Sequence, residues 1–121
     1  MEKQLHTGLN RQSKISLLQK LKHYDWSLFF WHLALEKILK GLITKHEKIP
    51  PPVHRLDKLA LLAEIKLTSE QVDQLKEISS FNLEARYDDY KHKFYKKATK
   101  EFALRWIKIC GGFYLWLLKK S

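Results

Sequence analysis

The hydrophobic pattern of residues 22–46 predicts a long helix that is apolar over most of its circumference. Large apolar side chains recur there at steps of three and four, at Tyr24, Leu28, Trp31, Leu35, Ile38 and Leu42. A second set, with Leu33, Ile43 and either Phe29 or Phe30, widens this stripe. Glu36, Lys37 and Lys40 are left to form a narrow polar face. Because a helix of this kind has neighbours on several sides, we expect the rest of the chain to pack around it.

The segments before and after this helix predict shorter helices. Residues 1–12 are polar with a weak pattern, as in a frayed lead-in, and Ser13 is placed to cap a helix through Leu21. Residues 50–52 are three consecutive prolines, which end the long helix and force an extended link. A short helix should follow the link and point Leu56, Leu59, Leu62 and Ala63 inward.

Two more helices complete the predicted fold. Thr68 or Ser69 should cap a helix over residues 69–85, with Val72, Leu75, Ile78 and Leu83 facing the core. Asp88 or Asp89 should cap a last helix that runs to about Leu118. Its apolar face would be Phe94, Ala98, Phe102, Trp106, Ile109, Phe113 and Leu117. With no alternation typical of strands, the pattern predicts an all-α, up-and-down bundle of about four to five helices.

Length and composition restrict the class of protein. A chain of 121 residues makes one domain with a single core, so we expect residues 1–121 to form one unit. No apolar run approaches the roughly 20 residues of a membrane span, and no signal-peptide pattern is present. The single cysteine, Cys110, forms no internal disulfide, fits a cytoplasmic location and is expected to fill the core.

The charge balance favours a polyanionic partner. Lys and Arg number 23 against 13 acidic residues, which gives a net charge of +10. Such an excess suits nucleic acid or an acidic protein, although it also serves as a solubility surface.

Positive charge is concentrated in residues 86–100, RYDDYKHKFYKKATK, where no acidic residue lies between Asp89 and Glu101. Cations at a helix start oppose the helix dipole, and a bound polyanion would relieve that cost. Aromatic rings between the lysines could stack on unpaired bases. The predicted nucleic-acid-binding residues are Tyr87, Tyr90, Lys91, Lys93, Tyr95, Lys96 and Lys97. The alternative interpretation is a solvated face with Phe94 buried in the core.

Arg86 and His92 in this segment are candidate catalytic residues for metal-independent RNA cleavage. A histidine can move a proton to or from the 2′-hydroxyl or the leaving oxygen, and an arginine can stabilise the charged phosphorane. In a chain with six histidines this spacing also arises by chance, so it gains meaning only from its context.

The remaining histidines and tryptophans indicate structural roles. None of His23, His32, His46 and His54 shows the ligand spacing of a zinc site, and no glycine-rich phosphate loop is present. We therefore expect neither a metal nor a cofactor. His54, close to a helix start, should cap or pack. The four tryptophans belong in the core or in a dimer interface.

Three segments together resemble the HEPN domain family. They are HLALEKILKGLI (32–43), the PP-x-H-x-L element of Pro51, Pro52, His54 and Leu56, and FNLEARY (81–87). Their order and distances fit over roughly residues 20–118. The resemblance implies a helical bundle that usually dimerises. It also implies a frequent operon partner, a minimal nucleotidyltransferase, in toxin–antitoxin pairs.

The resemblance also gives Arg86 and His92 a context. In many HEPN proteins an Arg-x4–6-His motif at the start of the last long helix forms a ribonuclease site across the dimer, and these two residues stand at that place. Three positions depart from the family pattern: Tyr87 replaces a small polar residue, Asp88 replaces a frequent proline, and Phe94 replaces a tyrosine that partner enzymes modify. Tyr95 follows one position further on.

Three hypotheses follow from these features. The first is a toxin-like, metal-independent endoribonuclease that acts as a homodimer and is neutralised by a minimal nucleotidyltransferase. The second, which the departures favour, is a non-catalytic HEPN subunit that binds a nucleotide or that partner through the same basic surface. The third is an architectural nucleic-acid binder, which would need only the positive charge.

Overall fold

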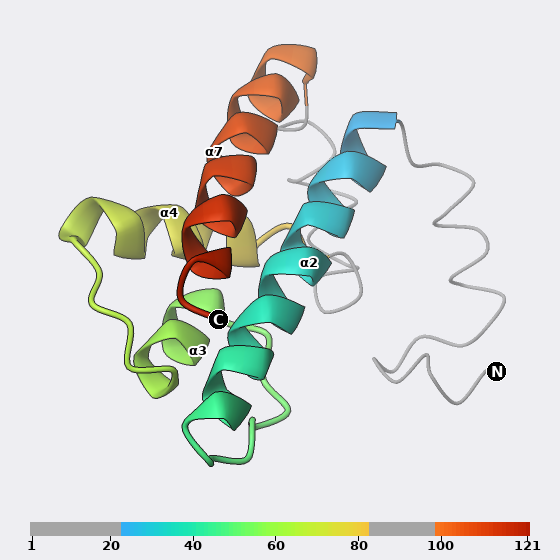
Figure 1. Cartoon of the computed structure of the whole chain (residues 1–121). Coiled ribbons are helices and arrows are strands. Elements are labelled where there is room, and N and C mark those ends of the chain that lie inside the picture. The colour runs from blue at the N-terminus through green and yellow to red at the C-terminus, as the bar shows by residue number, and fades with distance from the viewer. Residues whose placement is uncertain (1–22, 83–98) are drawn as a thin grey trace, which may run out of the picture.

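The computed structural model describes residues 23–82 and 99–121, which contain four helices and no strand (Figure 1). These helices are α2 (His23–Lys45), α3 (Leu56–Leu62), α4 (Ser69–Ser79) and α7 (Lys100–Leu118). The predicted all-α fold is confirmed, and the long central helix lies within one residue of its expected bounds. Within these ranges no helix combines the length and the apolar character that crossing a bilayer requires.

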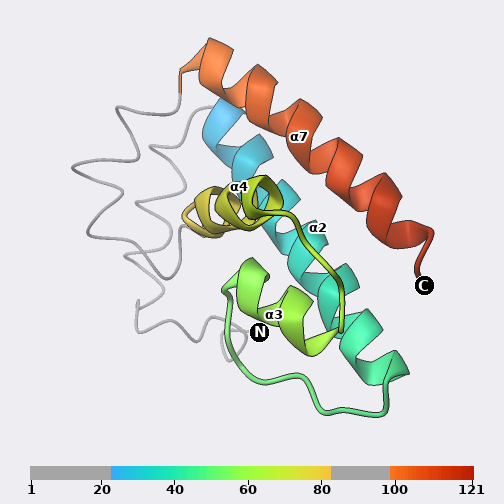
Figure 2. The same ribbon diagram turned by 90° about the vertical axis from the view of Figure 1, so that its left-hand side faces the viewer.

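Helix α2 is the centre of the described fold, because it contacts each of the other three helices. Helix α7 runs beside it in the same direction, and α3 and α4 pack against it as well (Figures 1 and 2). Leu28, Leu35, Leu39 and Ile43 of α2 are all fully buried. The sequence left open whether Phe29 or Phe30 belongs to the apolar side of this helix. Phe29 is buried, whereas Phe30 is 55% exposed. The 3.6-residue period thus located the core face of α2 correctly.

Buried residues of the neighbouring helices complete the core. Helix α7 contributes Ala103, Trp106, Cys110, Phe113 and Leu117. The Cys110 thiol is buried, and burial raises its pKa to about 12, which confirms Cys110 as a core residue rather than a reactive thiol.

One core assignment on α3 was wrong. Leu62 was expected to point inward but is 37% exposed, whereas Ala60 is buried. One side of α3 is buried, and it carries Leu56, Leu59, Ala60 and Ala63. Leu62 is rotated about the helix axis by roughly 100° or more from the centre of that buried side.

Side-chain caps define where α4 and α7 begin. Thr68 caps α4 in a complete capping box: its hydroxyl accepts from Gln71 N at 3.1 Å, and Gln71 Oε1 accepts from Thr68 N at 2.9 Å. Thr99 caps α7 by accepting a hydrogen bond from Phe102 N at 3.2 Å.

Two predicted helix bounds were therefore wrong. Helix α4 ends at Ser79 rather than continuing to residue 85, since the chain turns there to bury Phe81 and Asn82. Helix α7 begins at Lys100 rather than after Asp88 or Asp89. The lysines at positions 91–97, which were expected in the first turns of this helix, lie outside the described residues, and Lys100 is the first residue of α7.

The ends of α2 and α3 are joined through Glu64. Glu47 and Glu64 adopt left-handed backbone conformations, with φ of 61° and 60°. These conformations close both helices at some cost in strain, because neither residue is glycine. Glu64 accepts a hydrogen bond from Lys48 Nζ at 3.0 Å, and Lys48 also donates to the carbonyl of Leu62. The turn after α2 is thereby held against the turn after α3.

We expect Thr99→Ala to lower the free energy of unfolding by about 1 kcal/mol, because it removes the cap of α7. Thr44→Ala is the matched control, since the Thr44 hydroxyl bonds only to the Lys40 carbonyl of its own helix. Urea unfolding of both variants measures the difference. A Thr99→Ala variant as stable as the wild type would contradict a helix start at Lys100.

Candidate functional site

The predicted catalytic and nucleic-acid-binding residues lie outside the described ranges. Arg86 and His92 fall in the segment 83–98, as do Tyr87, Tyr90, Lys91, Lys93, Tyr95, Lys96 and Lys97. The structure therefore describes what surrounds this segment in the chain: Asn82 before it and Thr99 after it.

The two ends of that segment are held together by aromatic packing. The buried ring of Phe81 lies edge-on to the rings of Phe102 and Trp106, with centroid distances of 5.9 Å in both pairs. Edge-to-face pairs of this kind add to the free energy gained from burial alone. The chain just after α4 is consequently packed against the first two turns of α7.

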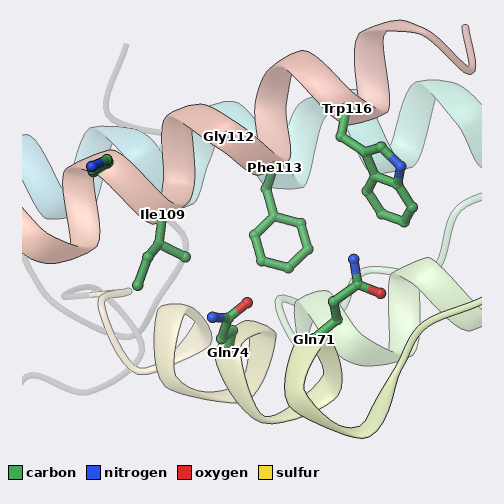
Figure 3. Close-up of a pocket in the computed structure, with 7 residues that line it drawn as sticks. Gln71, Gln74, Ile109, Gly112, Phe113 and Trp116 are labelled. Carbon is green, nitrogen blue, oxygen red and sulfur yellow. The ribbon is translucent and has the colours of Figure 1, made fainter.

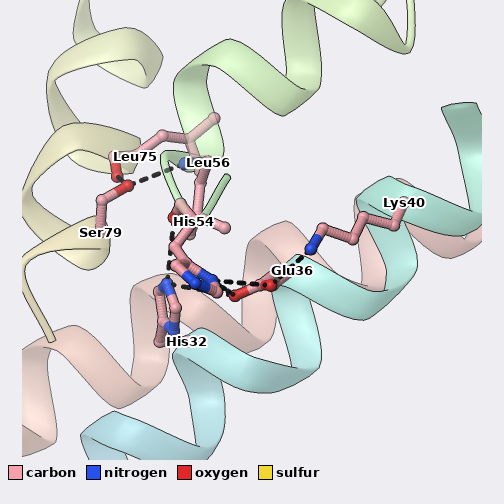
Figure 4. Close-up of polar contacts among 7 residues, drawn as sticks. All are labelled: His32, Glu36, Lys40, His54, Leu56, Leu75 and Ser79. Atoms are coloured by element: carbon pink, nitrogen blue, oxygen red, sulfur yellow. Dashed lines mark hydrogen bonds and ion pairs between the residues drawn. The ribbon is translucent and has the colours of Figure 1, made fainter. Parts of the chain in front are cut away.

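A buried polar cluster connects α2 to the link before α3 (Figure 4). The Glu36 carboxylate, 10% exposed, accepts a hydrogen bond from Lys40 Nζ at 2.8 Å. It also accepts from His54 Nδ1, at 3.1 Å to Oε1 and 3.0 Å to Oε2. The prediction that Glu36 lies on an exposed polar face was wrong, because Lys40 and the link at His54 cover it.

His32 completes the cluster from one turn earlier on α2. Its Nε2 donates to the backbone carbonyl of His54 at 3.2 Å, so His54 is held through both its side chain and its main chain. Burial is the main cause that lowers the pKa of His32, and the hydrogen bond to His54 opposes it only in part. The ring is therefore neutral at pH 7, and its 3.7 Å separation from Glu36 Oε1 is not an ion pair. Among the described residues, nothing bonds to the buried His32 Nδ1.

The charge of Glu36 is stabilised by its partners. Burial by itself raises the pKa of a carboxyl group, but the hydrogen bonds from Lys40 and His54 outweigh it, and the pKa of Glu36 is lowered. Because the cost of burying the carboxylate offsets part of the gain from its two donors, the net contribution of Glu36 to stability is modest.

The cluster is part of a longer chain of contacts. Two residues after His54, the Leu56 backbone N–H donates to Ser79 Oγ at 2.8 Å, and the Ser79 hydroxyl donates to the Leu75 carbonyl at 2.7 Å. These bonds tie the start of α3 to the last turn of α4. Through its hydrogen bonds with His54, Glu36 thus helps to fix the last turn of α4, after which the segment 83–98 begins.

His54 is the residue of this cluster whose side chain could contact a ligand or substrate. Its side chain is 47% exposed, and donation from Nδ1 to Glu36 leaves Nε2 as a hydrogen-bond acceptor, as in other carboxylate-oriented histidines. The neighbouring Arg55 is engaged in a bidentate pair with Asp57 at 2.9 and 2.8 Å, so it is not placed to stabilise a charged intermediate. Within residues 23–82 and 99–121, no group of His, Cys, Asp and Glu is arranged to hold a metal ion. The described geometry makes the cluster a structural lock with one accessible imidazole.

Sequence reasoning missed this cluster, although two signals pointed to it. His32 and Glu36 are four residues apart on one helix, which places them on the same face. His54 was correctly expected to pack near a helix start, but its partner Glu36 was assigned to solvent.

We expect Glu36→Gln to lower the free energy of unfolding at pH 7 by about 1–3 kcal/mol, because Lys40 and His54 lose a charged acceptor. The pKa of Glu36 is lowered from its ordinary value of 4.5, so its stabilising contribution is complete above that value. The contribution is lost as the pH falls through the folded-state pKa, and wild type and variant should converge there. Urea unfolding between pH 3 and 7 measures this, with the exposed Asp73→Asn as control. A difference that does not change over this pH range would contradict the assigned role.

The comparisons with known proteins agree with these observations. The HEPN domain model matches residues 1–121. No curated protein and no solved structure matches the chain. Two of the three segments that resemble the family contribute residues to the structural lock: His32 and Glu36 come from the first segment, and His54 comes from the second. The chain belongs to the HEPN domain family.

Proposed function

We propose that this HEPN protein is a metal-independent endoribonuclease with Arg86 and His92 as its catalytic residues. The observation that carries the proposal is the place of this pair in the sequence of a chain that belongs to the HEPN family: Arg86 lies within the FNLEARY element, and His92 follows it ahead of the last long helix. The proposal includes a toxin–antitoxin pair with a minimal nucleotidyltransferase, acting in the cytoplasm.

The anchoring of the segment 83–98 supports this assignment. Phe81, just before the segment, packs against Phe102 in the first turn of α7, just after it. Catalytic residues need such a rigid base, since small displacements of a reacting group cost large factors in rate.

The proposed reaction requires one base and one group that stabilises negative charge. His92 removes the proton from a ribose 2′-hydroxyl, and the 2′ oxygen bonds to the adjacent phosphorus while the bond to the 5′ oxygen breaks. The leaving oxygen takes up a proton, which yields a 2′,3′-cyclic phosphate and a 5′-hydroxyl. Arg86 stabilises the charged phosphorane in between. In a homodimer two copies of the pair share the site, so that one histidine acts as base and the other as acid.

An uncharged surface on α2 and α7 supports dimer formation. We call it the outer apolar face. It comprises Trp26, Phe30, Leu33 and Ala34 on α2, and Leu104, Ile107, Gly111, Tyr114, Leu115 and Leu118 on α7. The α7 residues fall within an arc of about 100°. Trp31 and Tyr114 join the two helices edge-on, with centroids 5.9 Å apart, and Gly111 leaves room for the Trp31 ring.

The size and charge of the outer apolar face suit a second copy of the chain. Phe30, Leu104, Leu115 and Leu118 are between 44% and 63% exposed. With their partly exposed neighbours they give α2 and α7 exposed apolar side chains of the kind that stable interfaces bury. Lys37 on α2 and Lys100 on α7 border this face. Because a chain of net charge +10 repels its own copy, two copies are most readily brought together where charged residues are fewest.

A second candidate function is a non-catalytic HEPN subunit that binds a nucleotide or its partner protein. Tyr87, Asp88 and Phe94 favour it, because these positions depart from the pattern of active and partner-modified relatives. Both candidates use the same segment, and the distinction between them is whether RNA is cut.

We expect Arg86→Ala and His92→Ala each to reduce RNA cleavage in EDTA by about 100- to 10,000-fold, because one removes charge stabilisation and the other proton transfer. Single-turnover assays with end-labelled RNA should detect the 2′,3′-cyclic phosphate product of the wild type. Growth inhibition on expression should disappear with the same substitutions, and a co-expressed minimal nucleotidyltransferase should suppress it in the wild type.

His46→Ala is the matched control, because His46 is exposed and its contact with Glu64 is a long 3.8 Å. Wild-type protein that cuts no RNA, or an equal rate after loss of His92, would reject the ribonuclease and leave the binding subunit.

We expect the protein to be a dimer in solution, and Leu115→Glu to shift it to the monomer. Leu115 is 63% exposed, so its replacement opens no cavity but places a buried, unpaired charge in the interface. Leu61→Glu is the control, since Leu61 is 75% exposed on α3, outside the outer apolar face. Light scattering gives the mass. A wild-type mass of 14.5 kDa at tens of micromolar would contradict the dimer.

A further inference from the structure

A groove of about 920 Å³ lies between α3 and the start of α4. Its apolar lining residues are Leu61, Ile65, Leu67 and Val72. Asp57 and Glu64 contribute two carboxylates to the lining, and Lys66 contributes its single cation. None of these residues belongs to the structural lock or to the outer apolar face, so neither feature accounts for the groove.

Exposed hydrophobic side chains gather at this end of the fold. Leu61 is 75% exposed in the groove, and Ile49 is 93% exposed. Ile49 follows Lys48, whose Nζ contacts Glu64 at 3.0 Å and the carbonyl of Leu62 at 3.0 Å, so it lies beside the end of α3. Large apolar side chains exposed together mark a contact site for another molecule. Because Ile49 is not part of the groove lining, a segment of a protein can cover this end of the fold more fully than a small ligand.

Both helix ends at this place are closed by a glutamate in a left-handed conformation, Glu47 after α2 and Glu64 after α3. The glutamate N–H donates to the carbonyl three residues back, and the next N–H donates five residues back. These bonds measure 2.8 and 3.3 Å after α2, and both measure 3.0 Å after α3. Glycine is the favoured residue at such a position, because a Cβ makes positive φ costly. Of the two glutamates only Glu64 lines the groove, which makes its carboxylate a candidate for a function.

The charge of this region differs from that of the whole chain. Of the 13 acidic and 23 basic residues of the chain, residues 57–73 contain four and two. Asp57 is engaged by Arg55 at 2.9 and 2.8 Å, which leaves Glu64 as the carboxylate for a ligand. The hydrogen bond from Lys48 lowers the pKa of Glu64, so the carboxylate is charged at pH 7. Its side chain is 56% exposed, and a second donor can reach it.

A groove between α4 and α7 does not share these properties (Figure 3). Gln71 and Gln74 of α4 face Phe113 and Trp116 of α7 there, and Lys108 also lines it. No carboxylate is among its lining residues. A cationic ligand would therefore find no opposite charge in it, and the α3–α4 groove is the one of the two that suits a cation.

From these features we infer that the α3–α4 groove binds a short segment of a partner protein that carries a lysine or arginine between apolar side chains. The cation would donate to Glu64, and the apolar side chains would cover Leu61 and Ile65. A nucleic acid would bring phosphates toward the two carboxylates of the groove, which repel them. The inference goes beyond the proposed function, because it uses neither the basic segment 86–100 nor Arg86 and His92.

The test is a calorimetric titration of the full-length protein with three capped peptides, SLKLLKLS, SLELLELS and SSKSSKSS. SLKLLKLS should bind with a micromolar dissociation constant, although the protein and the peptide are both positively charged overall. SSKSSKSS should bind at least about tenfold more weakly, because it has no apolar side chains. SLELLELS measures the attraction of acidic peptides to cationic surface elsewhere.

Glu64→Gly and Glu47→Gly are a matched pair, because both remove a left-handed glutamate. Both should raise the Tm by a few degrees, since glycine relieves the strain. Glu64→Gly alone should weaken the binding of SLKLLKLS, by about 10- to 100-fold, because it removes the charged acceptor. Glu64→Gln should weaken binding by a similar factor without the gain in Tm. A purely structural role of Glu64 predicts no loss of affinity in a more stable protein.

Two further variants locate the binding site. Leu61→Ser should weaken the binding of SLKLLKLS, and Leu61→Met should retain it, because methionine keeps the apolar contact. Gly112→Leu is the control, since its side chain fills the α4–α7 groove, where an added Cβ meets nothing within 4 Å. Its affinity for SLKLLKLS should equal that of the wild type.

Three results would overturn the inference. They are no binding of SLKLLKLS to the wild type at millimolar concentration, equal affinities of Glu64→Gly and Glu47→Gly, and loss of binding in Gly112→Leu but not in Leu61→Ser. Binding of SLELLELS that Leu61→Ser weakens as strongly as that of SLKLLKLS would overturn the assigned charge of the partner. Unchanged peptide affinity in Arg86→Ala and His92→Ala separates this result from the cleavage assays.

Discussion

The desolvated carboxylate of Glu36 is the constraint on which the arrangement of the short helices depends. A carboxylate at 10% exposure is unfavourable unless hydrogen-bond donors surround it. Lys40 comes from its own helix, but His54 must come from the chain beyond the three prolines. The link that covers Glu36 therefore also supplies a donor to it, so burial of the carboxylate and docking of the link onto α2 occur together. Once His54 is fixed, Leu56 reaches Ser79, and the last turn of α4 is placed as well.

Placement of α4 determines where the segment 83–98 begins and ends. After Ser79 the chain turns to bury Phe81 against Phe102 and Trp106, and this packing joins the end of α4 to the first turns of α7. Helix α7 therefore carries the aromatic anchor of the proposed catalytic segment in its first two turns.

The surface of the described fold is divided by charge. The chain carries a net charge of +10, yet the outer apolar face of α2 and α7 contains no charged residue. An uncharged patch of this size favours contact with another copy, and cationic surface remains for polyanions. The two kinds of surface are thus compatible with a dimer that binds RNA.

Local sequence determined the helices and much of the core of this protein, because helix period and caps act between residues only a few positions apart. The helical period predicted α2 and the burial of Leu28, Leu35 and Leu39. The start of α4 is set by Thr68 with Gln71, three positions later. The motif residues also identified the HEPN family before their structural role was known. Tertiary structure decided what depends on distant residues. Glu36 fits a polar face by period, but His54, 18 positions later, buries it. Both Asp89 and Thr99 are suitable caps, and α7 begins at the one beside the packing of Phe81 on Phe102, a contact that no local pattern contains.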